Sequence, residues 1–326
     1  MVSFDNILKA SHLAARGKSR RSGAVARFLV DAETEAFELE RELRDGTYRP
    51  GPLFEFTIFD PKVRKISAAP FRDRVVHHCM MSVLAPIFER RMVFESFACR
   101  KRKGQHAALF YAQKQLRRHE FFIKLDIRQF FASLDHRVVL ESLYRCVKDH
   151  RVGQLMEVIV RHPQSHGLPL GNLTSQWLAN LTLDRLDHFV KEQLRVRGYL
   201  RYMDDFVLFG DDRQQLRRAE QQLERFLVEV LGLQIKSAAT VRGPSSGGLP
   251  FLGWMVYPRL MRLRRDSIQR SKNRLREQAY RRVRGEISEE TFVSAVRSVL
   301  AHLDAGGAQG LRRRLFLDWV EVPGAP

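Results

Sequence analysis

Cysteine is scarce in this chain, which has three among 326 residues: Cys79, Cys99 and Cys146. They lie far apart and show no Cys-x-x-Cys spacing, which argues against both a zinc ribbon and a disulfide framework. Long hydrophobic runs are also missing, since no stretch of about 18 apolar residues is present to span a membrane, and the first residues contain no signal-peptide core. We therefore expect a cytoplasmic protein in a reducing compartment, with no membrane partner.

Acidic residues are in deficit. The chain has 56 Lys and Arg against 37 Asp and Glu, which gives a formal net charge of +19. Residues 259–284 alone hold 11 Lys and Arg and 2 Asp and Glu, so nearly half of the excess lies in one C-terminal segment. A basic excess of this size indicates a polyanionic partner, and nucleic acid is the usual one. The alternative for a charge run is a solvated helix face.

Hydrophobic residues make up 44% of the chain and aromatic residues 10%, enough for a folded core. The apolar spacing predicts a mixed α/β (α+β) protein in which short strands alternate with helices. The expected helices cover residues 1–46, 71–92, 105–118, a segment from about Asp135, 173–196, 212–231 and much of 258–320. The expected strands lie within 53–67 (two strands joined by a basic turn), at 121–126, on both sides of Asp204 and Asp205, and at 251–256, with a turn at 243–248.

Two adjacent aspartates form the most informative pattern. Asp204 and Asp205 separate the apolar runs 199–202 and 206–209, as expected for a hairpin tip. Two like charges there repel unless a cation lies between them, and a third carboxylate, Asp126, ends the strand-like run 121–125. Carboxylates on strand ends suit two Mg²⁺ ions that promote in-line phosphoryl transfer. The alternative is a plain turn, in which Asp is common.

Phe131 follows Asp126 by five residues. At this distance an aromatic ring can lie under the sugar of an incoming nucleotide, where its bulk would collide with a 2′-hydroxyl group and select deoxynucleotides. The alternative is a core phenylalanine beside Phe130.

Four motifs follow one another along the chain: Asp126-Ile127-x-x-Phe130-Phe131, Gly167-Leu168-Pro169-Leu170-Gly171-Asn172-Leu173-Thr174-Ser175-Gln176, Tyr202-Met203-Asp204-Asp205 and Phe251-Leu252-Gly253-Trp254. They occur in the order of the reverse transcriptase motifs, and residues 45–257 as a whole resemble that family. The branch that the chain resembles is the bacterial and phage branch related to group II introns, and the Ser175-Gln176 ending is similar to the reverse transcriptases of diversity-generating retroelements.

The resemblance implies a right-hand polymerase fold with fingers, palm and a helical thumb. Residues 1–50 would form a helical extension, 51–120 the fingers, 121–257 the palm and 258–326 the basic thumb. Two Mg²⁺ ions, with Mn²⁺ as an alternative, would be held by three carboxylates and one carbonyl group: Asp126, Asp204, Asp205 and the carbonyl of Ile127. The nucleotide would contact Lys62, Arg64, Arg74, Phe131, Leu170, Gly171 and Gln176.

The resemblance also implies contacts with primer and template. Tyr202 and Met203 would lie beside the primer terminus, residues 251–254 (Phe251, Leu252, Gly253 and Trp254) would form the primer grip, and the thumb would contact the duplex backbone through Arg270, Arg274 and Arg281. Arg100 would either meet template phosphate or pack structurally. In the thumb, Ile268, Leu275, Ala279 and Val283 would form a buried stripe. Many relatives have a lysine where this chain has Ala239, so the resemblance leaves open whether Lys236 protonates the leaving pyrophosphate.

Three pairs of residues are given structural interpretations. Adjacent His77 and His78 cannot share a helix face, so we reject a metal site there. Asp184 and Asp187 are interpreted as a surface pair. Asp211 and Asp212 are interpreted as helix caps.

The expected function is RNA-directed DNA synthesis. A diversity-generating member would copy a template-repeat RNA into adenine-mutagenised cDNA, with template RNA, RNA–DNA duplex and dNTPs as partners and a small basic accessory variability protein beside it. We expect no RNase H or endonuclease domain after the primer grip. The alternatives are a retron-like or phage-defence reverse transcriptase, also bacterial or phage-encoded, and a non-catalytic RNA-binding module, against which the complete aspartate set argues.

Overall fold

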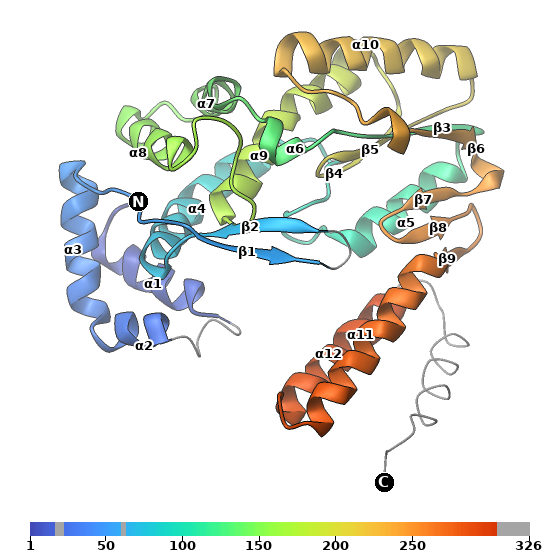
Figure 1. The fold of residues 1–326 in the computed structure, drawn as a ribbon. Helices are drawn as coiled ribbons and strands as arrows, with labels where there is room; N and C mark the ends of the chain where they lie inside the picture. The colour runs from blue at the N-terminus through green and yellow to red at the C-terminus, as the bar shows by residue number, and fades with distance from the viewer. Residues whose placement is uncertain (17–22, 60–62, 305–326) are drawn as a thin grey trace.

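The structure is a computed structural model, and it describes residues 1–16, 23–59 and 63–304. Three N-terminal helices, α1 (Phe4–Ala14), α2 (Gly23–Val30) and α3 (Ala32–Asp45), pack with the long helix α4 (Phe71–Arg91) at one end of the molecule (Figure 1). Ser3 begins α1 by accepting a hydrogen bond from the Asn6 amide, and Gly46 ends α3 at φ 71°. The helical structure predicted for residues 1–46 is therefore present as separate helices, and the segment 17–22 lies outside the described residues.

A two-stranded antiparallel hairpin follows, with β1 at Phe54–Ile58 and β2 at Arg64–Ala68. Both strands were predicted. Most of the connecting basic turn, including Lys62, lies outside the described residues. The hairpin packs against the loop that contains residues 170–172. The Ser67 amide donates to the Leu170 carbonyl at 2.8 Å, and the Ala69 amide donates to Asn172 Oδ1 at 3.1 Å.

The central sheet has four antiparallel strands in the order β4-β5-β3-β6. They are β3 (Phe121–Asp126), β4 (Gly198–Tyr202), β5 (Asp205–Gly210) and β6 (Val241–Pro244). Alternate side chains enter two different cores. Ile123 and Leu208 pack with the helices α9 (Leu173–His188) and α10 (Arg213–Leu231), whereas Phe122 and Phe209 pack with α5 (Gln105–Leu116) on the opposite face. Because both faces are covered, these strands are almost continuously apolar (Figure 1).

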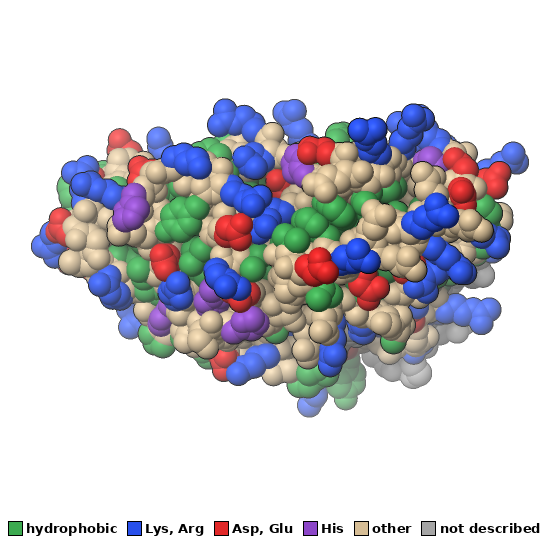
Figure 2. Space-filling model, turned by 90° about the horizontal axis from the view of Figure 1, so that it is seen from above, with side chains coloured by type: hydrophobic (Ala, Val, Ile, Leu, Met, Phe, Trp, Pro, Cys, Tyr) green, Lys and Arg blue, Asp and Glu red, His purple; other side chains and the backbone are tan. Residues whose placement is uncertain are grey.

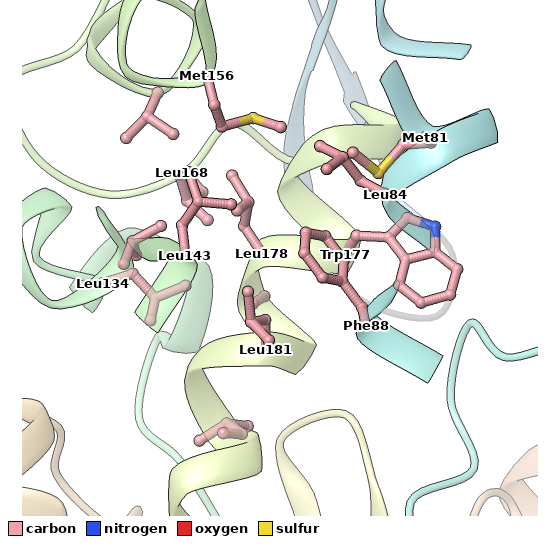
Figure 3. Packing of buried hydrophobic residues seen from close by; sticks show 14 of the residues in the cluster. Met81, Leu84, Phe88, Leu134, Leu143, Met156, Leu168, Trp177, Leu178 and Leu181 are labelled. Carbon is pink, nitrogen blue, oxygen red and sulfur yellow. The ribbon is translucent and has the colours of Figure 1, made fainter. Parts of the chain in front are cut away.

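The helices around the sheet begin and end largely where polar caps and glycines predict. They are α5 (Gln105–Leu116), α6 (Phe130–Ser133), α7 (His136–Tyr144), α8 (His150–Arg161), α9 (Leu173–His188) and α10 (Arg213–Leu231). Asp212 caps α10 through the amides of residues 214 and 215, and Gly232 ends it at φ 67°. Trp177 of α9 packs against Phe88 of α4, with ring centroids 6.2 Å apart (Figure 3). The predicted helix 173–196 instead changes to a π-helical turn at Phe189–Gln193.

A second, three-stranded sheet and two helices complete the described chain. The strands are β7 (Leu249–Phe251), β8 (Trp254–Val256) and β9 (Met261–Leu263), and the helices are α11 (Arg265–Val283) and α12 (Glu289–Asp304). The single strand predicted at 251–256 is wrong, because Leu252 (φ 47°) and Gly253 (φ 83°) form a turn that splits it. The predicted turn at 243–248 also contains the end of β6 and a short 3₁₀ turn.

Two further predictions for the C-terminal segment need correction. It does not begin as a helix, because β9 pairs with β8 before α11 starts. The proposed buried stripe is only partly buried: Leu275 lies in the core, Ile268 and Ala279 are half-buried, and Val283 is 71% exposed. The stripe ends early because α11 extends beyond the sheet against which its first turns pack.

The interpretation of Asp184 and Asp187 as a surface pair is wrong. Both side chains are buried on α9, and Asp187 is paired with the equally buried Arg201 at 2.6 Å. A carboxylate tolerates burial when a cation and hydrogen bonds compensate it. Asp211 is not a helix cap, since it accepts the Glu120 amide and contacts His119. Among the described helices, none is long and apolar enough to cross a membrane.

Candidate active site

The hairpin between β4 and β5 brings two of the predicted aspartates to one end of the central sheet. Residues 203 and 204 form the tip, with Met203 at φ 56°, and Asp205 opens β5 opposite Tyr202. On its other side, Asp205 lies directly opposite Asp126, the last residue of β3. Directly opposed residues of an antiparallel pair have Cβ atoms about 5 Å apart. The register therefore places Asp126 and Asp205 side by side, next to the turn that carries Asp204.

The electrostatics of this turn favour a bound cation. Burial, followed by the negative charges of Asp126 and Asp205, raises the pKa of Asp204 to about 6, while the positive charge of Arg64 acts in the opposite direction. A carboxyl group with a raised pKa is one whose charge is poorly compensated by the protein alone. Arg64, on the β1–β2 hairpin, therefore lies close enough to lower the pKa of Asp204.

Lys124 is a residue that the sequence analysis missed. Its Nζ lies 2.8 Å from Asp205 Oδ1. Lys124 precedes Asp126 by two positions on β3, so both side chains point to the same face of the sheet. This period-two spacing was a signal that could have identified Lys124. The pair partly balances the negative charge of the aspartate cluster.

The donor set has the chemistry that divalent magnesium prefers, because every predicted ligand is an oxygen. The described residues nevertheless hold no group of three His, Cys, Asp or Glu side chains gathered closely enough to count as a ready-made metal site. The Ile127 backbone is fixed beside the cluster by its bridge to Ile235.

Phe131 lies on the short helix α6, directly after β3. It is half-buried, its ring is 5.3 Å from that of Phe130, and its carbonyl accepts a hydrogen bond from the Leu168 amide at 2.7 Å. Gly167, at φ 78°, allows this approach, since a Cβ atom there would lie 2.9 Å from the Ala132 carbonyl oxygen. The loop that leads to Leu170 is therefore anchored beside Phe131.

The same loop contacts the β1–β2 hairpin through Gly171. Gly171 has φ 115°, and a Cβ atom on it would lie 2.9 Å from Ile66 Cγ2. Leu170 is half-buried at this junction. The glycine is thus required both by its backbone conformation and by the close packing of β2.

Gln176 lies one turn into α9 and is half-buried. Its side-chain oxygen accepts a hydrogen bond from the Cys99 thiol at 3.4 Å. Burial and the proximity of Cys99 raise the pKa of the Tyr202 hydroxyl group. Gln176, Cys99 and Tyr202 therefore form one wall beside the turn that carries Asp204, and Cys99 is the member that the sequence analysis missed.

Comparison with known proteins identifies the family. Residues 59–256 match the family described as reverse transcriptase (RNA-dependent DNA polymerase). The chain belongs to the reverse transcriptase family. Members of this family are nucleotidyltransferases that use divalent metal ions, template RNA and dNTPs.

The relatives of this reverse transcriptase include bacterial proteins. It is 26% identical to the group II intron-encoded protein LtrA of Lactococcus lactis over 186 residues, which cover 52% of this chain and 31% of LtrA. It is 26% identical to the protein YkfC of Escherichia coli over 171 residues, which cover 48% of this chain and 45% of YkfC. The match therefore spans less than half the length of either relative.

A solved structure is similar to this reverse transcriptase in fold. Apo telomerase from Candida tropicalis superposes with a TM-score of 0.55 at 10% sequence identity, over 68% of this chain and 50% of that chain. Together with the family match, this agrees with a right-hand polymerase fold, as predicted.

Two arginines of the reverse transcriptase are engaged away from the catalytic turn. Arg74 donates to the Ala14 carbonyl at 2.5 Å, which ties α4 to α1. The Arg100 side chain is 6% exposed and pairs with Glu89 at 2.9 Å, while it also donates to the Ser96 carbonyl at 2.9 Å. Of the two alternatives for Arg100, structural packing is favoured. Lys236 has an exposed side chain, but its backbone amide donates to the Asp126 carbonyl at 2.7 Å.

A groove lies where the predicted primer grip meets the two C-terminal helices. Its volume is about 610 Å³, and its lining includes Leu252, Gly253, Arg270 and Arg274. Phe251 and Trp254 are buried in the second core, so they support the turn from below. Arg281 lies outside the groove lining and pairs with Glu286 at 3.3 Å. Lys and Arg side chains are spread over the face of the reverse transcriptase seen in Figure 2.

Proposed function

We propose that this chain synthesises DNA on an RNA template by nucleotidyl transfer with two Mg²⁺ ions, Mn²⁺ being an alternative. The observation that carries the proposal is the register that places Asp126 opposite Asp205, beside the turn of Asp204. When bound, the ions would activate the 3′-hydroxyl group and stabilise charge on the reacting phosphate. Asp126, Asp204, Asp205 and the Ile127 carbonyl would hold them, and Lys124 would orient Asp205.

The proposed nucleotide pocket lies between the β1–β2 hairpin and the loop 167–176. Arg64 would neutralise the triphosphate, which is consistent with its electrostatic effect on Asp204. Phe131 would lie under the sugar, and Leu170, Gly171 and Gln176 would border the nascent base pair. Lys62 and Arg74 complete the expected set: Lys62 lies outside the described residues, and the contact of Arg74 with α1 makes a supporting role the simpler proposal.

The primer and template would lie between residues 51–120 as fingers, 121–257 as palm and 258–326 as thumb. The groove at Leu252 and Gly253 would hold the primer strand near Tyr202 and Met203. Arg270 and Arg274 line the same groove, and Arg281 lies further along α11. Guanidinium groups on one helix suit the phosphate backbone of a duplex.

The finer assignment is an adenine-mutagenic reverse transcriptase of a diversity-generating retroelement. The Ser175-Gln176 ending supports it, and the similarity to LtrA supports the intron-related branch. In this role the chain would work with a small basic accessory protein in a bacterial cytoplasm. The alternative is a retron-like or phage-defence enzyme of the same chemistry.

The test is primer extension on an RNA template with four dNTPs and Mg²⁺, followed by sequencing of the cDNA. Asp204→Ala is the control, and the protein is assayed alone and with any small protein encoded beside its gene. Errors concentrated opposite template adenines would support both proposals. Faithful cDNA that depends on Asp204 would retain the polymerase and overturn the mutagenic assignment. Extension that persists in Asp204→Ala would overturn the proposed catalytic site.

A further inference from the structure

Arg201 is a fully buried arginine that immediately precedes the catalytic turn. Its guanidinium group donates to both carboxylate oxygens of Asp187, through Nε at 2.7 Å and Nη2 at 2.6 Å. It also donates to the Met203 carbonyl at 3.3 Å, which belongs to the left-handed residue of the turn itself. The arginine therefore holds the backbone from which Asp204 projects.

Two further partners come from other parts of the chain. Arg201 donates to Asn180 Oδ1 on α9 at 2.8 Å and to Ser96 Oγ, just after α4, at 3.0 Å. The backbone of Arg201 is paired with the same segment, since its amide donates to the Glu95 carbonyl and its carbonyl accepts the Phe97 amide. A guanidinium group has five N–H donors, and here all of its edges are engaged.

Asn180 connects this arginine to the wall of the proposed nucleotide pocket. While its Oδ1 accepts from Arg201, its Nδ2 donates to the Ala98 carbonyl at 2.8 Å. The next residue, Cys99, has φ 55° and donates its thiol to Gln176. Gln176 lies on the same helix as Asn180, one turn earlier. The buried side-chain amide of Asn180 thus contacts both Arg201, which holds the catalytic turn, and the Ala98 carbonyl, which directly precedes Cys99.

A buried and fully hydrogen-bonded network of this kind is rigid, and loss of one partner leaves costly unpaired groups. Rigid support is what a catalytic turn needs, since an error of about 1 Å in the position of a reacting group can lower a rate 10²-fold. Nothing in the folding of α9 alone requires an asparagine at a position buried on all sides. The hydrogen bonds of Asn180 to Arg201 and to the Ala98 carbonyl account for an asparagine at this position.

We propose that Arg201 and Asn180 are positioning residues that couple the catalytic turn to the pocket wall formed by Cys99 and Gln176. Arg201 fixes the backbone position of Asp204 through its hydrogen bond to the Met203 carbonyl. Asn180 sets the distance between that turn and the wall, and so contributes to nucleotide selection. The inference rests on the proposed polymerase function.

The test compares three variants of the full chain: Asn180→Ala, Asn180→Asp and Ser96→Ala. Asn180→Ala removes both contacts, so kcat falls by at least about tenfold and the ratio of kcat/KM for matched and mismatched dNTPs changes. Asn180→Asp keeps an acceptor for Arg201 but has no N–H for Ala98, so kcat falls less than in Asn180→Ala while the discrimination ratio changes as much. Ser96→Ala removes one partner of Arg201 without touching the wall, and it keeps the parent discrimination ratio.

Thermal unfolding of each variant establishes that it is folded. If Asn180→Ala does not fold, Asn180→Asp decides the question. Folded Asn180 variants whose discrimination ratio equals that of Ser96→Ala and of an active parent would overturn the coupling and leave the polymerase intact. A parent that extends no primer would instead overturn the proposed function, and this inference with it.

Discussion

At the scale of single residues, the three carboxylates Asp204, Asp205 and Asp187 differ in how far neighbouring cations compensate their charge. Asp204 is a carboxylate that the folded protein makes difficult to ionise, whereas Asp205 has a lysine at 2.8 Å and Asp187 an arginine at 2.6 Å. Of these three carboxylates, Asp204 at the tip of the turn is the one whose negative charge the protein compensates least. A site that is poorly compensated by protein charges alone is the one where a cation has most to contribute.

The first prediction concerns pH. The pKa of Asp204 is about 6 in the folded protein, above the ordinary value of about 3.9 for an unfolded aspartate. Between these values the folded state binds the proton more tightly, so this group lowers stability as pH rises from about 4 to 6. We expect metal-free Asp204→Asn to melt at a higher temperature than the parent at pH 7.5, with a smaller difference at pH 4.5. A Tm difference that does not vary with pH would contradict this.

The second prediction concerns Lys124. Lys124→Met removes the partner of Asp205 and adds repulsion among the carboxylates, so the free energy of unfolding in metal-free buffer should fall by about 1 kcal/mol. Removing one positive charge should also tighten the binding of Mn²⁺, measured by titration calorimetry on the free protein. Lys124→Arg, which retains the charge, serves as control. Unchanged metal affinity in Lys124→Met would show that Lys124 does not act on the site.

At the scale of elements, the β1–β2 hairpin and the loop before α9 behave as one unit. The hydrogen bond from the Ser67 amide to the Leu170 carbonyl, that from the Ala69 amide to the Asn172 side chain, and the close packing of Gly171 on Ile66 hold the hairpin against the loop. This junction places Arg64 near Asp204, so a nucleotide pocket depends on packing between segments about 100 residues apart.

The third prediction tests this junction. Gly171→Ala places a methyl group 2.9 Å from Ile66 on a backbone at φ 115°, which should cost about 1–3 kcal/mol and raise KM for dNTPs by displacing the hairpin. Gly46→Ala is the matched control, because Gly46 also has a positive φ but nothing lies within 4 Å of the added Cβ atom. Equal KM values in the two variants would show that the hairpin junction does not shape the pocket.

Element types were largely predictable because the periodicity is strong. The strand ending at Asp126, the hairpin around Asp204 and the helix α10 with its cap are all present. The split between β7 and β8 was missed, since Leu252 adopts a positive φ that no local rule assigns to leucine. The burial of Asp184 and Asp187 was missed because a helix covered on all sides shows no polar face, and the compensating Arg201 is supplied only by tertiary packing.

At the scale of the whole molecule, two arginines of the basic C-terminal segment lie at the groove beside α11. Arg270 and Arg274 line it, together with the turn at Leu252 and Gly253. The sequence located these residues in separate segments. Only the fold brought the turn and the helix together, and only the fold placed Arg100 against Glu89 and the Ser96 carbonyl, Lys124 beside Asp205, and Cys99 beside Gln176.

The fourth prediction follows from this arrangement. Each of Arg270→Gln and Arg274→Gln should weaken binding to an RNA–DNA duplex and reduce the slope of log K against log salt by about 1, as measured by fluorescence anisotropy across salt concentrations. Arg161→Gln, on α8, is the control and should leave the slope unchanged. Equal slopes in all three variants would show that the groove does not contact the duplex.

The most direct test of the central claim is single-turnover incorporation of one dNTP on a primed RNA template, with Mg²⁺ titrated, in the parent and in Asp126→Asn. If Asp126 and Asp204 hold catalytic metal ions, the parent incorporates the complementary nucleotide, and Asp126→Asn is at least about 10³-fold slower while retaining its fold and its affinity for the primed template. Incorporation by folded Asp126→Asn at the parent rate would contradict the account.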